Sequence, residues 1–144
     1  MIHLAMALYA ATAVAAVPQE AVVQHRGVSY EVSYRPQVRT TYKTVGMSVG
    51  TRPSTERCRW TTEVAFERSI RRNGQTEAHD RTIPASRVIE GSHPGNCQQA
   101  RHALGEEGPV KPAKVERLLA EVIAADRPTM LADIDAAHAL ASAN

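Results

Sequence analysis

The segment from Arg57 to Ile70, RCRWTTEVAFERSI, constrains the fold more than any other part of the chain. Its residues alternate with a period of two, which is the pattern of a β-strand with one buried face. The inward face carries the chain's only Trp and only Phe: it consists of Cys58, Trp60, Thr62, Val64 and Phe66. Aromatic residues make up only 4% of the chain, and these two rings are predicted to be the largest apolar groups available to the core.

Three further segments have strand character. Residues 27–34, GVSYEVSY, alternate strictly, and residues 37–49 are rich in Val, Thr and Tyr. Pro36 lies between them and is expected to break the run or to mark a sheet edge. Asn73-Gly74 predicts a type I′ hairpin turn, so residues 75–89 should fold back on the central strand. A two-residue loop pairs Val64 with Ile83, Thr62 with Ala85, and Cys58 with Ile89.

The last third of the chain has helical periodicity. A short helix is predicted around Cys97, Ala100 and Leu104, and a second helix starts at Pro112 with an apolar stripe to about residue 125. Pro128 is expected to end that helix, and a third follows it. The inner side of this third helix is formed by Leu131, Ile134, Ala137 or His138, and Ala141.

These elements predict one α+β domain over residues 17–144, and a chain of 144 residues is long enough to bury its own core. A four-stranded, mostly antiparallel meander sheet occupies residues 27–90. Two to three C-terminal helices occupy residues 94–142 and form a layer on one face of the sheet.

The two cysteines, Cys58 and Cys97, are predicted to form a disulfide, because an even cysteine count in an exported chain favours pairing. The bridge closes a loop of about forty residues, which the chain-entropy model equates with about 4 kcal/mol of stability. It would fasten the helical part to the central strand. The alternative is two unpaired, buried thiols.

Export is indicated by an uncharged apolar run of fourteen residues from Leu4 to Val17. A helix of this length spans about 21 Å, which is short of the roughly 30 Å core of a bilayer. Small residues at its end provide cleavage sites, so residues 1–16 are predicted to be a secretory signal peptide. The protein is therefore expected in the periplasm or outside the cell, without a transmembrane segment. A buried, alanine-rich first helix is the alternative.

The first half of the chain is rich in Arg, and three tyrosines lie among these basic residues. Arg and Tyr on an exposed sheet can bind anionic polymers through charge and stacking. The predicted surface consists of Arg26, Tyr30, Tyr34, Arg35, Arg39, Tyr42 and Lys43. We expect a non-catalytic binding protein of the bacterial envelope, whose partner is an acidic glycan, a lipid headgroup or an acidic protein rather than nucleic acid. In the alternative interpretation the tyrosines belong to the core and the arginines only aid solubility.

Catalytic and metal-binding motifs are weaker. Gly46-Met47-Ser48-Val49-Gly50 matches the G-x-S-x-G of serine hydrolases, but a nucleophile elbow needs a helix after the serine, and TRPST does not favour one. A serine hydrolase is kept as the alternative function. No cofactor is predicted, and no metal, since the cluster of His93, Cys97 and His102 shares its cysteine with the disulfide. His79-Asp80 is expected to be a surface pair, with His79 facing Arg68.

Overall fold

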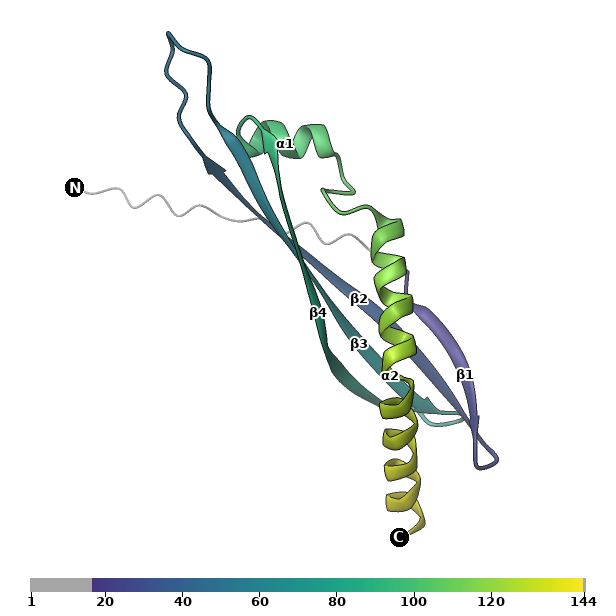
Figure 1. Ribbon diagram of the computed structural model, residues 1–144. Coiled ribbons are helices and arrows are strands. Elements are labelled where there is room, and N and C mark those ends of the chain that lie inside the picture. The colour runs from purple at the N-terminus through teal and green to yellow at the C-terminus, as the bar shows by residue number, and fades with distance from the viewer. Residues whose placement is uncertain (1–16, 144) are drawn as a thin grey trace, which may run out of the picture.

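The computed structural model describes residues 17–143 and confirms the predicted α+β class. Its elements are β1 (Gln19–His25), β2 (Val28–Val45), β3 (Arg57–Arg72), β4 (Ala78–Pro94), α1 (Cys97–Leu104) and α2 (Pro112–Ser142). The four strands form an antiparallel meander in the order β1-β2-β3-β4. The sheet is long and twisted, and α2 runs along it while α1 lies near the opposite end from the C-terminus (Figure 1). The predicted signal peptide lies outside the described residues.

The strand count is as predicted, but two of the four strands differ from the prediction. β1 was not expected, and the predicted strands 27–34 and 37–49 form one continuous strand, β2. Pro36 lies two residues beyond Tyr34, where the ladder with β1 ends. His25 and Val28 flank a two-residue turn and form a hydrogen-bonded pair, so even-numbered residues of β2 point their backbone groups toward β1. The N–H that proline lacks would therefore face the unpaired edge, and Pro36 removes no ladder bond.

The type I′ turn occurs at a different hairpin from the predicted one. Arg26 (φ 50°) and Gly27 (φ 75°) both have positive φ and connect β1 to β2, which is the requirement of that turn type. Asn73-Gly74 does form a tight turn, in which the Gln75 N–H donates to the carbonyl of Arg72 at 3.0 Å. Only Gly74 has positive φ (82°) there, so the type I′ prediction was wrong while the turn itself is confirmed.

The predicted register between β3 and β4 was also wrong. Near the turn Phe66 pairs with Ile83, but beyond a register shift Val64 pairs with Arg87. Thr62 consequently faces Ile89 and Cys58 faces His93. The shift includes Pro84, which cannot donate to a ladder and is tolerated at a bulge on an edge strand. His79 faces Ile70 rather than Arg68.

Two helices are present rather than three, because α2 continues through Pro128 for 31 residues. Its sheet-facing stripe is buried on both sides of the proline, with Leu119 and Val122 before it and Met130 and Ile134 after it. Packing along this stripe outweighs the cost of one missing N–H. Of the predicted inward pair of alternatives, Ala137 is exposed and His138 is half-buried, and Ala141, also predicted to face inward, is exposed. The helix start at Pro112 and the whole of α1 are as predicted.

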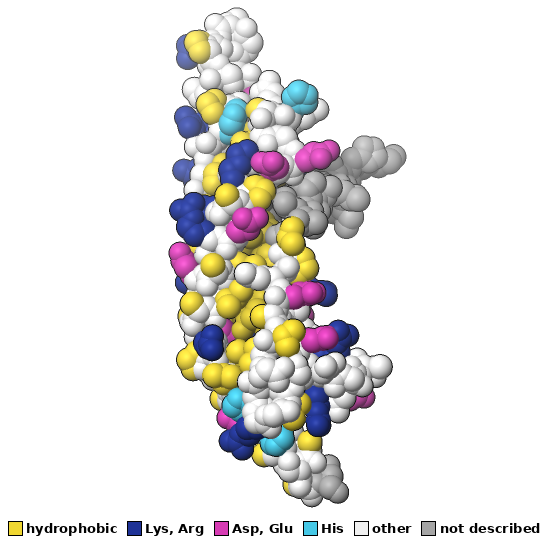
Figure 2. All heavy atoms as spheres, turned by 90° about the vertical axis from the view of Figure 1, so that its right-hand side faces the viewer, with side chains coloured by type: hydrophobic (Ala, Val, Ile, Leu, Met, Phe, Trp, Pro, Cys, Tyr) yellow, Lys and Arg dark blue, Asp and Glu magenta, His cyan; other side chains and the backbone are white. Residues whose placement is uncertain are grey.

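The core lies between the sheet and α2. Val64 and Phe66 are fully buried, and Ile134 is 1% exposed. Figure 2 shows hydrophobic side chains gathered in a band along the length of the molecule, with charged side chains at its margins. Trp60 is only half-buried; its ring covers Gly91 of β4, where an added Cβ would lie 2.2 Å from the ring. The phenylalanine is therefore at the centre of the core, and the tryptophan is toward its end.

Candidate functional site

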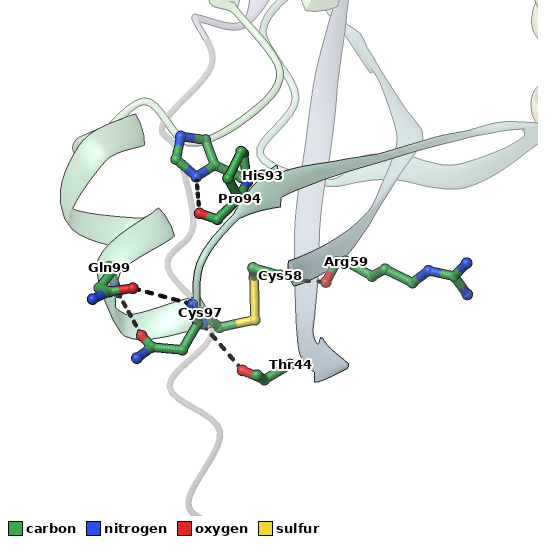
Figure 3. Close-up of a disulfide and its surroundings, with 8 residues drawn as sticks. Thr44, Cys58, Arg59, His93, Pro94, Cys97 and Gln99 are labelled. Carbon is green, nitrogen blue, oxygen red and sulfur yellow. Dashed lines mark hydrogen bonds between the residues drawn. A yellow bond between two sulfur atoms is a disulfide. The ribbon is translucent and has the colours of Figure 1, made fainter. Parts of the chain in front are cut away.

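The disulfide between Cys58 and Cys97 is confirmed. The Cα atoms are 4.7 Å apart, within the usual disulfide range, and the bridge joins β3 to the first residue of α1. The Cys97 N–H donates to Thr44 Oγ1 at 3.1 Å, and Asn96 caps the helix through a capping box with Gln99 (Figure 3). Arg101 stacks over the Tyr42 ring at 4.6 Å. The first turn of α1 is therefore held to both β2 and β3.

A buried polar cluster joins α2 to the sheet. The guanidinium of Arg68, 1% exposed, donates to Asp126 and to Asp133 of α2. Asp126 also accepts from the Tyr34 hydroxyl at 3.0 Å, and Asp133 pairs with Arg81 at 2.9 Å. Each charged side chain in this cluster has a partner of opposite charge, so the cluster serves to dock the helix.

The pKa values in this cluster follow from the same contacts. Burial raises the pKa of Tyr34 to about 12, and the neighbouring Asp126 carboxylate adds to the effect. Burial also raises the pKa of Asp133, but the hydrogen bond from Arg81 and the charges of Arg68 and Arg81 outweigh it and hold that pKa below its usual value. Tyr34 is thus a neutral donor and Asp133 an anion at neutral pH.

A second contact joins the β1–β2 turn to α2. His25 Nε2 lies 2.7 Å from Asp135 Oδ1, and Arg26 Nε lies 3.0 Å from the same oxygen. The hydrogen bond with His25 lowers the pKa of Asp135 most, and the charge of Arg26 lowers it further. Arg26 is therefore engaged in the fold.

The sheet face turned away from both helices, which we call the open face, has an unusual arrangement of charge at its end near α1. Odd-numbered residues of β2 and β3 point to this face, because even-numbered residues such as Cys58 and Phe66 are buried under the helices. Four exposed cations, here called the basic end, lie there in adjacent strands: Arg39, Lys43, Arg57 and Arg59. Lys43 and Arg59 are direct cross-strand partners.

Among the described residues, the cations of the basic end have no ion-pair partners. Within residues 17–143 no carboxylate oxygen lies within 4.0 Å of a nitrogen of these four side chains. Arg57 donates to the neutral Ser92 hydroxyl at 3.0 Å. Arg39 lies opposite Glu63 across the strands without forming a salt bridge by that distance. Like charges placed directly opposite each other on neighbouring strands reduce stability, so the sheet gains nothing from Lys43 beside Arg59.

The other half of the open face is a shallow basin of about 550 Å³ with an acidic excess. Its charged lining residues are Glu20, Glu31, Arg35, Glu67, Arg71 and Asp80. Here Arg71 pairs with Glu31, and Gln37 donates to Glu67 at 3.1 Å, while Arg35 forms no salt bridge within residues 17–143. The open face is therefore polarised along its length, with the acidic excess in the basin half and the four cations of the basic end in the other half.

The structure does not bring the seven residues of the predicted Arg/Tyr surface together. Tyr30 and Tyr34 are 4% and 3% exposed on the helix-covered face, and Tyr42 is covered by Arg101. The remaining cations of the set are split, since Arg26 binds Asp135 while three of them lie on the open face: Arg35, Arg39 and Lys43. Arg57 and Arg59 were not included in the prediction. Their position at alternate residues on the outward face of the central strand is a signal that could have identified them.

The other sequence motifs do not form the catalytic or metal site that their residues could suggest. Ser48 lies in the loop after β2, and no helix follows it, so the strand–serine–helix elbow is not formed. Cys97 is bonded to Cys58, and His93 Nδ1 contacts the carbonyl oxygen of Pro94. His79 and Asp80 are neighbours in β4 and so project to opposite faces of the sheet.

Comparison of the chain with protein-family models, with curated proteins and with solved structures finds no match. Within the described residues, no helix is both long enough and apolar enough to cross a membrane.

Proposed function

We propose that this chain is an exported, non-catalytic binding protein whose basic end contacts an anionic component of the cell envelope. The observation that carries the proposal is the placement of Lys43 directly opposite Arg59 and beside Arg57, with no carboxylate partner among the residues that the structure describes. Such an arrangement costs stability in the free protein and is relieved when an anion lies over it. Export is supported by the apolar run at residues 4–17 and agrees with the disulfide.

The rigidity of the surface also supports this function. The basic end lies on paired β-strands next to the disulfide, so its charges are held in place before a partner arrives. A pre-organised site loses less conformational entropy on binding than a flexible tail does. Arg side chains also offer planar, bidentate contacts to carboxylate, sulfate or phosphate groups.

Heparin provides a soluble anionic polymer with which to test the proposal. The protein recovered from its native host is titrated with heparin at low salt, beside the charge-reversed variant Lys43→Glu/Arg59→Glu. The control Lys114→Glu/Arg117→Glu makes the same change in net charge at two exposed residues of α2. We expect the first variant to bind at least about tenfold more weakly, which corresponds to about 1.4 kcal/mol, and the control to bind nearly as the parent does. Equal losses in the two variants would mean that only net charge matters and would refute a specific site.

A further inference from the structure

The loop between β2 and β3 places apolar side chains at the outer limit of the basic end. It covers residues 46–56 and projects beyond α1, at the end of the molecule away from the C-terminus (Figure 1). Met47 is 69% exposed and Val49 is 48% exposed. The chain has an acidic residue in this loop only at Glu56, next to β3. Arg52 adds a cation near the tip.

The loop is held in one conformation by hydrogen bonds. Met47 and Thr55 are joined by backbone and side-chain bonds of 3.0–3.2 Å, and the Arg52 N–H donates to the Val49 carbonyl at 2.9 Å. Gly46 has φ of 92°, and a Cβ there would lie 2.4 Å from the Thr55 carbonyl oxygen. The loop therefore holds Met47 and Val49 on a structured tip. Both side chains stay exposed to water there, which costs free energy that burial would have avoided.

We infer that the anionic partner of the basic end is a phospholipid surface, and that this loop inserts Met47 and Val49 between its headgroups. This inference rests on the proposed function and narrows its partner class. An apolar tip above a group of cations matches the two layers of an anionic membrane, in which charged headgroups lie over hydrocarbon. A soluble glycan would use the cations but would leave Met47 and Val49 exposed to water.

Vesicle sedimentation tests this inference. Vesicles of phosphatidylcholine with phosphatidylglycerol are compared with vesicles of phosphatidylcholine alone, using the parent protein, Met47→Ser/Val49→Ser and Lys43→Glu/Arg59→Glu. The control Val22→Ser/Leu140→Ser removes two exposed apolar side chains at other places, where Val22 is 67% exposed and Leu140 is 72% exposed. We expect binding only to the anionic vesicles, about tenfold weaker binding for the loop variant and for the charge variant, and no change for the control.

The possible outcomes separate this inference from the proposed function. Anionic vesicle binding that is lost in the charge variant but unchanged in the loop variant would overturn insertion and leave the proposed function standing. Binding to heparin without binding to either kind of vesicle would do the same. If neither heparin nor anionic vesicles bind, both proposals fail. As an independent readout, Met47→Trp should show a blue-shifted emission on adding anionic vesicles, beyond any change of Trp60 in the parent.

Discussion

Two arginines of the same strand, Arg68 and Arg59, lie on opposite faces of the sheet and have opposite surroundings. Arg68 is 1% exposed and is bound by two aspartates of α2. Arg59 is exposed and lies opposite Lys43. On the covered face a cation needs carboxylate partners, because a buried charge without a partner strongly reduces the stability of the fold. On the open face water screens the repulsion, and a chain can keep adjacent cations at small cost. The first arginine therefore docks α2 on the sheet, whereas the second is exposed and belongs to the surface for which we propose an anionic partner.

Removing the buried arginine tests the covered side of this comparison. In Arg68→Met, Asp126 stays buried with only the Tyr34 hydroxyl as donor, so we expect a loss of about 3–5 kcal/mol in the free energy of unfolding. Urea unfolding of the variant and the parent measures this loss. In Arg68→Met/Asp126→Leu no buried charge is stranded at that position, so much of the loss should be recovered. A single variant as stable as the parent would show that the ion pairs do not dock α2.

The two helices of the covered face are attached to the sheet by different contacts, α1 by the disulfide and α2 by the ion pairs of Arg68. Removing the disulfide should therefore affect the two helices differently. Cys58→Ser/Cys97→Ser should lower the free energy of unfolding by about 2–5 kcal/mol. Hydrogen exchange should show early loss of protection in α1, which the bridge anchors at its first residue, while α2 remains protected through Arg68. Simultaneous loss of protection in both helices would indicate that α2 depends on α1 for its position.

The acidic partners of the covered face predict a pH dependence with a definite sign. The pKa of Asp133 is lowered in the fold, so its contribution is present above the unfolded value near 3.8 and is lost as pH falls through the lower folded value. Asp133→Asn should therefore be less stable than the parent at pH 7, and the difference should shrink below about pH 3.8. Urea midpoints at pH 7 and at about pH 2.5 provide the comparison. A difference that is the same at both pH values would contradict this role.

The sequence allowed the central strand, the disulfide and α1 to be predicted, because each depends on local pattern or on cysteine count. Pro36 and Pro128 misled the prediction. Local propensity disfavours proline inside a strand and inside a helix. Pro36 is nevertheless accommodated because its position faces an unpaired sheet edge, and Pro128 because a continuous buried stripe of α2 packs on both sides of it. Such tertiary compensation is not visible in a local window of residues.

The buried cluster could have been found from the sequence, whereas the division of the basic surface could not. Arg68 continues the inward face of β3 by the period of two, and Asp126 interrupts the apolar stripe of α2; two opposite charges on facing apolar surfaces indicate a pair. The predicted Arg/Tyr surface mixed residues of both faces, because alternation in 28–34 showed that the tyrosines share a face but not which face the helices cover.

The most direct test of the account is the affinity of Arg59→Glu for heparin at low salt, measured on protein whose unfolding midpoint is recorded in the same buffer. Because the substitution places a carboxylate opposite Lys43, stability should be unchanged or higher by about 0.2–1 kcal/mol. Affinity should nevertheless fall by about fivefold or more relative to the parent, and Arg117→Glu should show a much smaller loss. If Arg59→Glu binds heparin as tightly as the parent does, the unpartnered cations of the open face are not a binding surface.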